Sequence, residues 1–279
     1  MSETAKAHPH QDYLRLAKFP FIWCPGCGNG IIVNSFLRVV GKLAIPKDEI
    51  TLISGIGCSS RAPGYLDFNT LHTTHGRALA FATGIKLAKP HLKVVVISGD
   101  GDMAAIGGNH LIHACRRNID MTALVFNNNI YGMTGGQLSP TTPRGAKAST
   151  AQFGSIDPPF DIAELAAAAG ASFVGRTTVH HAAQADKLIE KGLARRGFSL
   201  IEVATMCPIA YGRRNRLGGP VEMLQLLKEA AVPVARAQQM TAEELEGRIT
   251  TGILADRERP EYVQEYMDLC RRIGGGGKE

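Results

Sequence analysis

The chain has 279 residues, 44% of them hydrophobic, which is enough for one large α/β domain or two small ones with a sizeable core. Its formal net charge of +6 is mild for this length, and no basic stripe interleaved with aromatic residues indicates nucleic-acid binding. The lack of a long apolar run and of an apolar signal core at the polar N-terminus predicts a cytoplasmic protein without a membrane span.

Apolar periodicity and turn residues predict that helices and strands alternate along the chain. After a polar arm at 1–20, strands are expected at 49–54, 93–98, 121–126, 172–174 and 198–204. Helices are expected at 31–43, 78–88, between the strands at 93–98 and 121–126, at 161–169, at 179–195 and from 220 onward, and a long loop is expected at 138–159. Asn29 is the expected N-cap of the helix at 31–43, and Asp161 that of the helix at 161–169. This alternation favours a mostly parallel sheet with helices on both faces. We interpret 21–215 as one α/β domain and 216–279 as a C-terminal helical extension with a flexible Gly-rich tail.

Polar residues and glycines follow the two central strands. The strand at 93–98 ends in Gly99-Asp100-Gly101-Asp102, and the strand at 121–126 ends in Asn127-Asn128-Asn129. Ligands of open α/β sheets bind at the carboxyl ends of the strands. A carboxylate, an amide oxygen and Gly-rich backbone suit Mg²⁺ bound to a diphosphate. An ordinary strand-end turn would also explain Gly-Asp-Gly, but it would not explain the asparagine cluster at the next strand end.

Four of the six cysteines stand next to glycine or proline, namely Cys24, Cys27, Cys58 and Cys207. In a cytoplasmic chain this pattern favours a metal or redox role over structural disulfides. Three interpretations remain open: a thioredoxin-type thiol pair at Cys24 and Cys27, a structural zinc site on all four, or a [4Fe–4S] cluster.

Position along the chain helps to separate these interpretations of the cysteines. Cys58 and Cys207 each follow a strand, so they are expected at the same sheet edge as Asp100. A cluster there could take electrons from a neighbouring cofactor, whereas a structural zinc would have no such chemistry. We expect Cys115 to pack as a small apolar residue, and we assign no role to Cys270.

Several segments in order resemble one enzyme family. The segment from Asn127 to Gln137, which follows the Gly-Asp-Gly turn, resembles the thiamine diphosphate motif of the 2-oxoacid:ferredoxin oxidoreductases. The other matching segments are Trp23-Cys24-Pro25-Gly26-Cys27-Gly28, Gly55-Ile56-Gly57-Cys58-Ser59, His72 to Arg77 and Cys207-Pro208. Together they resemble the β subunit of a two-subunit enzyme of this family. Gly28-Asn29 and Arg61 make the 2-oxoglutarate:ferredoxin oxidoreductase (2-oxoglutarate synthase) branch the most similar.

The resemblance implies a thiamine-diphosphate-binding fold and a set of site residues. Asp100, Asn128 and the backbone carbonyl of Ile130 would hold Mg²⁺, and Arg61 would contact a substrate carboxylate, although it could equally be an exposed loop arginine. One [4Fe–4S] cluster would be held by Cys24, Cys27, Cys58 and Cys207. The residues placed around thiamine diphosphate are Ile56, Gly57, Cys58, Ser59, His75, Gly99, Asp100, Gly101, Asp102, Asn128, Gly132 and Met133. His75 has the alternative of a polar loop residue.

The activity implied is thiamine-dependent oxidative decarboxylation of a 2-oxoacid, with 2-oxoglutarate favoured, to acyl-CoA (succinyl-CoA) and CO₂, or the reverse reductive carboxylation. Electrons would pass through the cluster to ferredoxin. Pyruvate or branched-chain 2-oxoacids are alternative substrates. A non-oxidative thiamine decarboxylase subunit would not need the four cysteines, and a zinc-stabilised α/β binding module would leave Asp100 and Asn128 unexplained.

The resemblance implies an α subunit and an external ferredoxin as partners. Glu164 and Glu202 are not in a motif suited to activating thiamine, so we expect an α subunit to supply that glutamate on a pyrimidine-binding domain. The assembly would be an αβ heterodimer or (αβ)₂. No cysteine run typical of a built-in ferredoxin module occurs, so ferredoxin should be external. The run from Arg213 to Arg216 is either a solvated face or a guide for acidic ferredoxin.

Overall fold

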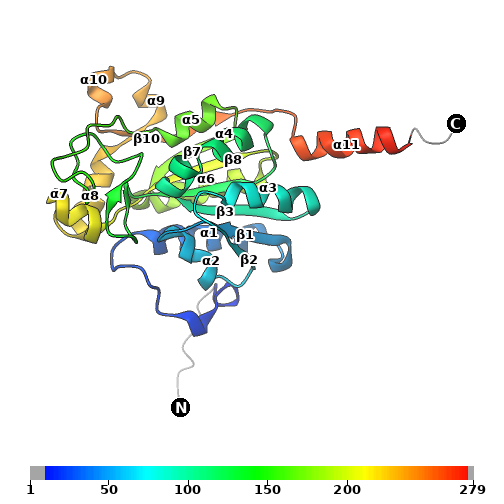
Figure 1. The fold of residues 1–279 in the computed structure, drawn as a ribbon, viewed down its shortest axis with the longest axis horizontal. Coiled ribbons are helices and arrows are strands. Elements are labelled where there is room, and N and C mark those ends of the chain that lie inside the picture. Colours follow the sequence, from blue (N-terminus) through cyan, green and yellow to red (C-terminus); the bar gives the residue numbers. More distant parts are fainter. Residues whose placement is uncertain (1–9, 276–279) are drawn as a thin grey trace, which may run out of the picture.

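The computed structural model describes residues 10–275. The first nine residues of the expected N-terminal arm and the last four of the Gly-rich tail lie outside this range. An eight-stranded sheet of order β2-β1-β3-β4-β8-β7-β10-β9 runs through the molecule, with helices on both sides (Figure 1). The strands are β1 (Ile50–Ser54), β2 (Asn69–His72), β3 (Lys93–Gly99), β4 (Thr122–Asn127), β7 (Phe173–Thr178), β8 (Ser199–Ala204), β9 (Ala231–Pro233) and β10 (Ile249–Asp256), and β5 (Ile130–Tyr131) forms a separate antiparallel pair with β6 (Gln137–Leu138).

All pairs of neighbouring strands in the large sheet are parallel except β7 with β10, so the predicted mostly parallel α/β fold is confirmed. The helices are α1 (Asn29–Leu43), α2 (Ala62–Tyr65), α3 (Ala78–Ala88), α4 (Gly108–Arg117), α5 (Ile162–Ala168), α6 (Ala182–Ala194), α7 (Arg213–Asn215), α8 (Pro220–Ala230), α9 (Val234–Ala237), α10 (Ala242–Leu245) and α11 (Tyr262–Gly275). Short 3₁₀ turns lie at Gln11–Tyr13, Leu16–Lys18, Lys47–Glu49, Ser59–Arg61 and Val179–His181, and π-helical turns at Asp102–Ile106 and Pro208–Gly212.

Alternate residues of the central strands serve two separate cores. In β3, Val95 and Ile97 pack with α1 and α6, whereas Val94 and Val96 pack with α3 and α4 on the opposite face. Successive strand side chains point to opposite faces, so an uninterrupted apolar run fits a strand that is covered on both. This explains why the run at 93–98 is an interior strand.

Some details differ from the sequence expectations. Gly28, at φ +83°, occupies the N-cap of α1 and Asn29 is the first helical residue, so the cap assigned to Asn29 is wrong. β2 replaces part of an expected loop, and β10 adds a strand to the C-terminal region. The cap at Asp161 is confirmed, because its side chain accepts a hydrogen bond from the Glu164 N–H at 2.8 Å.

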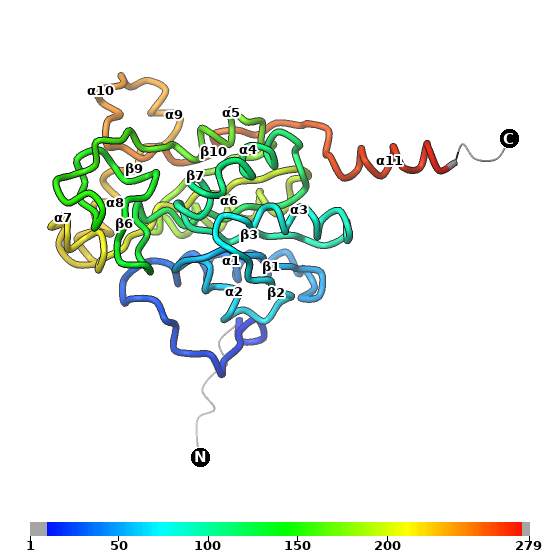
Figure 2. Tube along the Cα trace, viewed as in Figure 1, coloured from blue at the N-terminus to red at the C-terminus, as the bar shows by residue number. Residues whose placement is uncertain are grey.

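The C-terminal region follows the outside of the sheet. After α8 the chain forms α9 and α10 and returns through β10 to pair with β7. It ends in α11, which extends away from the body (Figure 2). The carboxyl ends of β1, β3, β4 and β8 remain together at one edge, and the loops that follow them form the site described below.

Candidate functional site

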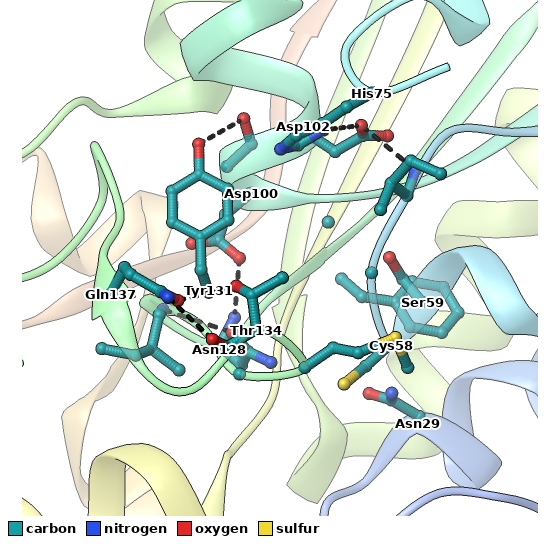
Figure 3. A pocket seen from close by; sticks show the side chains of 18 of the residues that line it. Asn29, Cys58, Ser59, His75, Asp100, Asp102, Asn128, Tyr131, Thr134 and Gln137 are labelled. Carbon is teal, nitrogen blue, oxygen red and sulfur yellow. Dashed lines mark hydrogen bonds and ion pairs between the residues drawn. The ribbon is translucent and has the colours of Figure 1, made fainter. Parts of the chain in front are cut away.

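A cavity of about 310 Å³ opens at the carboxyl ends of β1, β3 and β4 (Figure 3). Every residue that the resemblance placed around thiamine diphosphate or magnesium lines it, namely Ile56, Gly57, Cys58, Ser59, His75, Gly99, Asp100, Gly101, Asp102, Asn128, Ile130, Gly132 and Met133. The cavity is also lined by Asn29, Ile106, Phe126, Tyr131, Thr134 and Gln137, which were not in the expected set. Residues far apart in sequence therefore meet in one site.

Asp100 is the buried carboxylate of this cavity, with 2% of its surface exposed. Its Oδ2 accepts hydrogen bonds from the hydroxyls of Ser139 and, at 2.6 Å, of Thr141. Burial raises the pKa of Asp100, and these hydroxyls oppose the rise. The contact that another described residue makes with its Oδ1 is a long one, from the Asn128 N–H at 3.5 Å. One carboxylate oxygen is therefore held in place while the other retains capacity for a cation.

The Asp102 side chain contacts three segments that form one wall of the cavity. Its Oδ1 is in hydrogen-bond contact with the His75 Nδ1 atom and accepts hydrogen bonds from the backbone N–H groups of Gly76 at 2.6 Å and Ile56 at 3.3 Å. Its Oδ2 accepts from the Ser98 hydroxyl at 2.7 Å. These contacts occupy the carboxylate, so Asp102 acts as an internal link between loops, and only its backbone is left to face a ligand.

Tyr131 closes another side of the cavity. Its hydroxyl donates to the Gly101 carbonyl at 3.1 Å, and its ring lies edge-on to His75 with centroids 5.7 Å apart. A Cβ at Gly101 would overlap that ring, which explains the glycine. Burial raises the pKa of Tyr131 to about 12, so the phenol stays protonated at neutral pH.

The four loop cysteines lie close enough to influence one another. Burial is the main cause that raises the pKa of Cys58 to about 11, and Cys207, Cys27 and Cys24 contribute to this rise. Burial likewise raises the pKa of Cys27, against the effect of the Asn29 backbone N–H. All four are free thiols. As expected, Cys115 is buried in the core; Cys270 is exposed.

Gly132, which lines the cavity, lies beside two of the cysteine sulfurs. A Cβ added to Gly132 would lie 3.2 Å from the Cys207 Sγ and 3.9 Å from the Cys58 Sγ. The Trp23 indole N–H fixes the Cys58 loop by donating to its carbonyl at 2.7 Å. Any larger residue at 132 would press on the sulfurs.

Within residues 10–275, no three His, Cys, Asp or Glu side chains converge on a point that one metal ion could occupy.

Arg61 does not line this cavity. The 3₁₀ turn Ser59–Arg61 directs Ser59 into it but places Ser60 and Arg61 in an adjacent pocket of about 400 Å³, together with Lys18 and His72. Arg61 is exposed there. The structure therefore separates the expected carboxylate-binding residue from the other expected site residues.

A buried polar network behind the cavity was not foreseen. Asn127 links its two ends: its Nδ2 donates to Glu202 at 2.7 Å, and its Oδ1 accepts from Thr141 at 3.2 Å, the same hydroxyl that holds Asp100. Glu202 faces Arg176 at 3.7 Å, and both are largely buried, at 3% and 7% exposed. In the sequence, the feature that pointed to this network was Glu202, a charged residue inside the apolar strand predicted at 198–204.

Arg176 anchors the far end of this network. It pairs with Asp161 at 2.6 Å and donates from Nε to the Thr250 carbonyl at 2.8 Å, which connects β7 to β10. Burial raises the pKa of Glu202, and Arg176 opposes that rise. The network therefore runs from the antiparallel β7–β10 pair to the carboxylate in the cavity.

Among the described residues, no helix has both the length and the apolar character required to cross a lipid bilayer.

Comparisons with known proteins identify similar chains. Residues 55–203 match the family model of the thiamine pyrophosphate enzyme C-terminal TPP-binding domain. The 2-oxoglutarate synthase subunit KorB of Methanocaldococcus jannaschii is 52% identical over 266 residues, covering 95% of this chain and 98% of that protein. KorB of Methanothermobacter thermautotrophicus is 53% identical over 270 residues, covering 97% and 94%.

A solved structure extends the similarity to three dimensions. The 2-oxoglutarate:ferredoxin oxidoreductase from Magnetococcus marinus, solved with 2-oxoglutarate, coenzyme A and succinyl-CoA bound, aligns with a TM-score of 0.86 at 31% identity. The alignment covers 99% of this chain and 94% of the solved one.

Proposed function

This chain belongs to the family of 2-oxoacid:ferredoxin oxidoreductase β subunits, in the branch of the KorB subunits of 2-oxoglutarate synthase, and we propose that it converts 2-oxoglutarate and coenzyme A to succinyl-CoA and CO₂ together with an α subunit. Each turnover would release two electrons and one proton, and the reverse reaction is reductive carboxylation. The observation that carries the proposal is that one cavity is lined by the Gly99-Asp100-Gly101 turn, by Asn128 and by Cys58.

The residues of the cavity fit thiamine diphosphate with Mg²⁺. Asp100 offers a carboxylate oxygen at a strand end, beside Asn128 and Ile130, and these three would hold the ion. Glycines 57, 99, 101 and 132 leave room for phosphate close to the backbone. Bound thiamine diphosphate would supply the carbanion that attacks the 2-oxo carbon. Asp102 and Tyr131 would fix the loops around it, while His75, held by Asp102, would face the cofactor.

The cysteines fit a [4Fe–4S] cluster. Cys24, Cys27, Cys58 and Cys207 interact electrostatically, and Cys58 also lines the cofactor cavity. A bound cluster would accept electrons one at a time. Because Cys58 lines the cavity and Gly132 lies beside the Cys58 and Cys207 sulfurs, the two cofactors would lie close together. An external ferredoxin would then take the electrons.

An α subunit is part of the proposal. No glutamate is among the described residues that line the cavity, so the group that activates thiamine would come from outside the chain. The assembly would be αβ or (αβ)₂. Arg61 is proposed to contact a substrate carboxylate, which requires its exposed side chain to turn from the pocket that it shares with Lys18 toward the cavity.

The test is to co-express the chain with its α partner, purify the complex without oxygen and measure iron, acid-labile sulfide, zinc and thiamine. We expect about one four-iron cluster per chain, with an EPR signal after reduction, and CoA-dependent dye reduction that is fastest with 2-oxoglutarate. Faster reduction with pyruvate or branched-chain 2-oxoacids would reassign the substrate. Thiamine without iron would indicate a non-oxidative decarboxylase, and zinc without thiamine a binding module.

A further inference from the structure

Glu202 lies inside β8, in a layer of the sheet that is largely apolar. In the register of the sheet it stands between Val125 of β4 and Arg176 of β7. Val125, Leu200 and Val174 belong to the core on this face, and all three are fully buried. Burial of a charged pair costs about as much free energy as the pair returns, so stability alone does not explain a glutamate at this position.

The two carboxylate oxygens of Glu202 have different neighbours. Oε2 faces Arg176 at 3.7 Å and, although buried, makes no hydrogen bond with a described residue. Oε1 accepts a hydrogen bond from the Nδ2 atom of Asn127 at 2.7 Å. An ionised carboxylate only accepts hydrogen bonds, so Glu202 determines which end of the Asn127 amide points toward it.

The opposite end of the Asn127 amide contacts the turn that follows β4. Its Oδ1 accepts a hydrogen bond from the Asn129 N–H at 3.1 Å and lies 3.2 Å from the Thr141 hydroxyl. A backbone N–H only donates, so a flipped amide would place two donors against each other. With an acceptor on one side and a donor on the other, the amide has one favourable orientation.

This turn carries two of the proposed magnesium ligands, Asn128 and Ile130. Between them, Asn129 has φ +60°, in the left-handed region that costs free energy for a residue with a Cβ. Two hydrogen bonds hold Asn129: its N–H donates to Asn127, and its carbonyl accepts from the Thr142 hydroxyl at 2.7 Å. Loss of the first bond would allow the turn to relax and would move both ligands.

We propose that Glu202 is a positioning residue for the magnesium ion. It fixes the amide of Asn127, and this amide holds the turn that presents Asn128. Glu202 itself does not line the cavity, so it would act without touching the ion. Removal of such an outer partner of a metal ligand typically weakens metal binding by about 10- to 100-fold. The inference rests on the proposed function and adds to it a residue that lies behind the cavity.

The test measures metal binding by the complex with the α subunit, after bound magnesium and thiamine diphosphate have been removed. Mn²⁺ replaces Mg²⁺, because the EPR signal of free Mn²⁺ falls as the ion binds and so gives the dissociation constant in the presence of thiamine diphosphate. We expect Glu202→Gln to raise this constant about tenfold or more. The introduced amide has to turn an N–H group toward either Arg176 or the Asn127 Nδ2, and both of these are donors.

Kinetics of the same variant separate positioning from a general loss of structure. The KM for thiamine diphosphate at fixed Mg²⁺ should rise with the Mn²⁺ dissociation constant. At saturating cofactor, kcat and the KM for 2-oxoglutarate should stay within about twofold of the wild type, because a filled site has its ligands in place.

An exchange of the two polar groups should restore binding. In Asn127→Asp/Glu202→Gln, the introduced glutamine can donate to the introduced carboxylate and turn its oxygen toward Arg176, while the carboxylate accepts from the Asn129 N–H. We expect this double variant to bind Mn²⁺ within about threefold of the wild type. Asn127→Asp alone sets two carboxylates side by side and should bind Mn²⁺ more weakly than the double variant at pH 8.

Ser199→Ala is the matched control on the same strand. Ser199 is fully buried in β8, and its hydroxyl makes no hydrogen bond with a described residue. The change removes a buried polar atom that has no connection to the turn after β4. It should leave the Mn²⁺ dissociation constant within about twofold of the wild-type value, because independent sites do not couple.

The positioning role is wrong if Glu202→Gln binds Mn²⁺ as tightly as the wild type, or if Ser199→Ala loses as much affinity as Glu202→Gln. It is also wrong if Asn127→Asp alone binds as tightly as the double variant, since charge rather than orientation would then set the affinity. If Glu202→Gln does not assemble, the double variant decides: an affinity within about threefold of the wild type supports the role, and a larger loss or failure to assemble refutes it. A wild-type complex that binds neither Mn²⁺ nor thiamine diphosphate would refute the proposed function itself.

Discussion

Replacement of Arg176 by Met would leave Glu202 buried without the cation that faces it. The Arg176 Nη1 and Glu202 Oε2 atoms are 3.7 Å apart, and both residues are more than nine-tenths buried. At an effective dielectric constant of about 20, that separation corresponds to about 4 kcal/mol. This agrees with the roughly 3–5 kcal/mol lost when one partner of a buried pair is removed. We expect a loss of this size in the free energy of unfolding at pH 8.

The loss should depend on pH in a defined direction. Burial already raises the pKa of Glu202, Asp161 and Asp100 add to the rise, and Arg176 opposes it. Without Arg176, the pKa of Glu202 in the folded chain rises further above its unfolded value, so the folded state binds more protons. Stability of the variant therefore falls as the pH rises between these two values, and the deficit at pH 5 should be smaller than at pH 8.

Guanidinium unfolding of the purified chain, followed by circular dichroism at both pH values, measures this effect. Arg195→Met is a suitable control, because its ion pair with Asp256 is partly exposed and should contribute below about 1 kcal/mol. The double variant Arg176→Met/Glu202→Gln should recover part of the loss, since it also removes the buried charge at position 202 that Arg176 no longer faces. A deficit below about 1 kcal/mol, or one that is equal at pH 5 and pH 8, would refute the reasoning.

Three further predictions concern the cavity and the cysteines. Thr141→Val removes a hydroxyl that positions Asp100, so Mg²⁺-dependent affinity for thiamine diphosphate, measured by calorimetry, should fall about tenfold or more; unchanged affinity would contradict this role. Cys58→Ala should abolish the cluster by iron and sulfide analysis, whereas Cys115→Ala should keep it, because Cys115 lies in the core; equal iron contents would refute the assignment. Gly132→Val should lower iron content by crowding the sulfurs, and full iron occupancy would show that they can move aside.

The cavity could be predicted from sequence because its residues follow parallel strands. Once β3 and β4 are recognised as neighbours, Asp100 and Asn128 have to lie at the same sheet edge. The apolar runs of these strands are long and uninterrupted, so their positions are well determined by the sequence. Similar reasoning placed Cys58 and Cys207 near that edge.

Other features depend on three-dimensional contacts that leave little trace in the sequence. β2 is an edge strand whose residues are exposed or half-buried, and β10 contains Gly252 at φ +122°. Neither strand therefore shows a regular alternation of apolar and polar residues in the sequence. Glu202 within the apolar strand β8 indicated a buried charge. Its partner Arg176 lies on β7, and the sequence does not show that the two residues face each other. The direction of Arg61 depends on a 3₁₀ turn, in which successive side chains differ by about a third of a turn.

The distribution of the cysteines has a consequence for biogenesis. Cys24 and Cys27 precede α1, Cys58 follows β1, and Cys207 follows β8, which pairs with β4 and β7 in the sheet. A nascent chain that ends before β8 carries three of the four thiols and no closed binding site. Insertion of the proposed cluster should therefore follow synthesis of the first 207 residues, and translation arrest before that point should yield chains that do not retain iron.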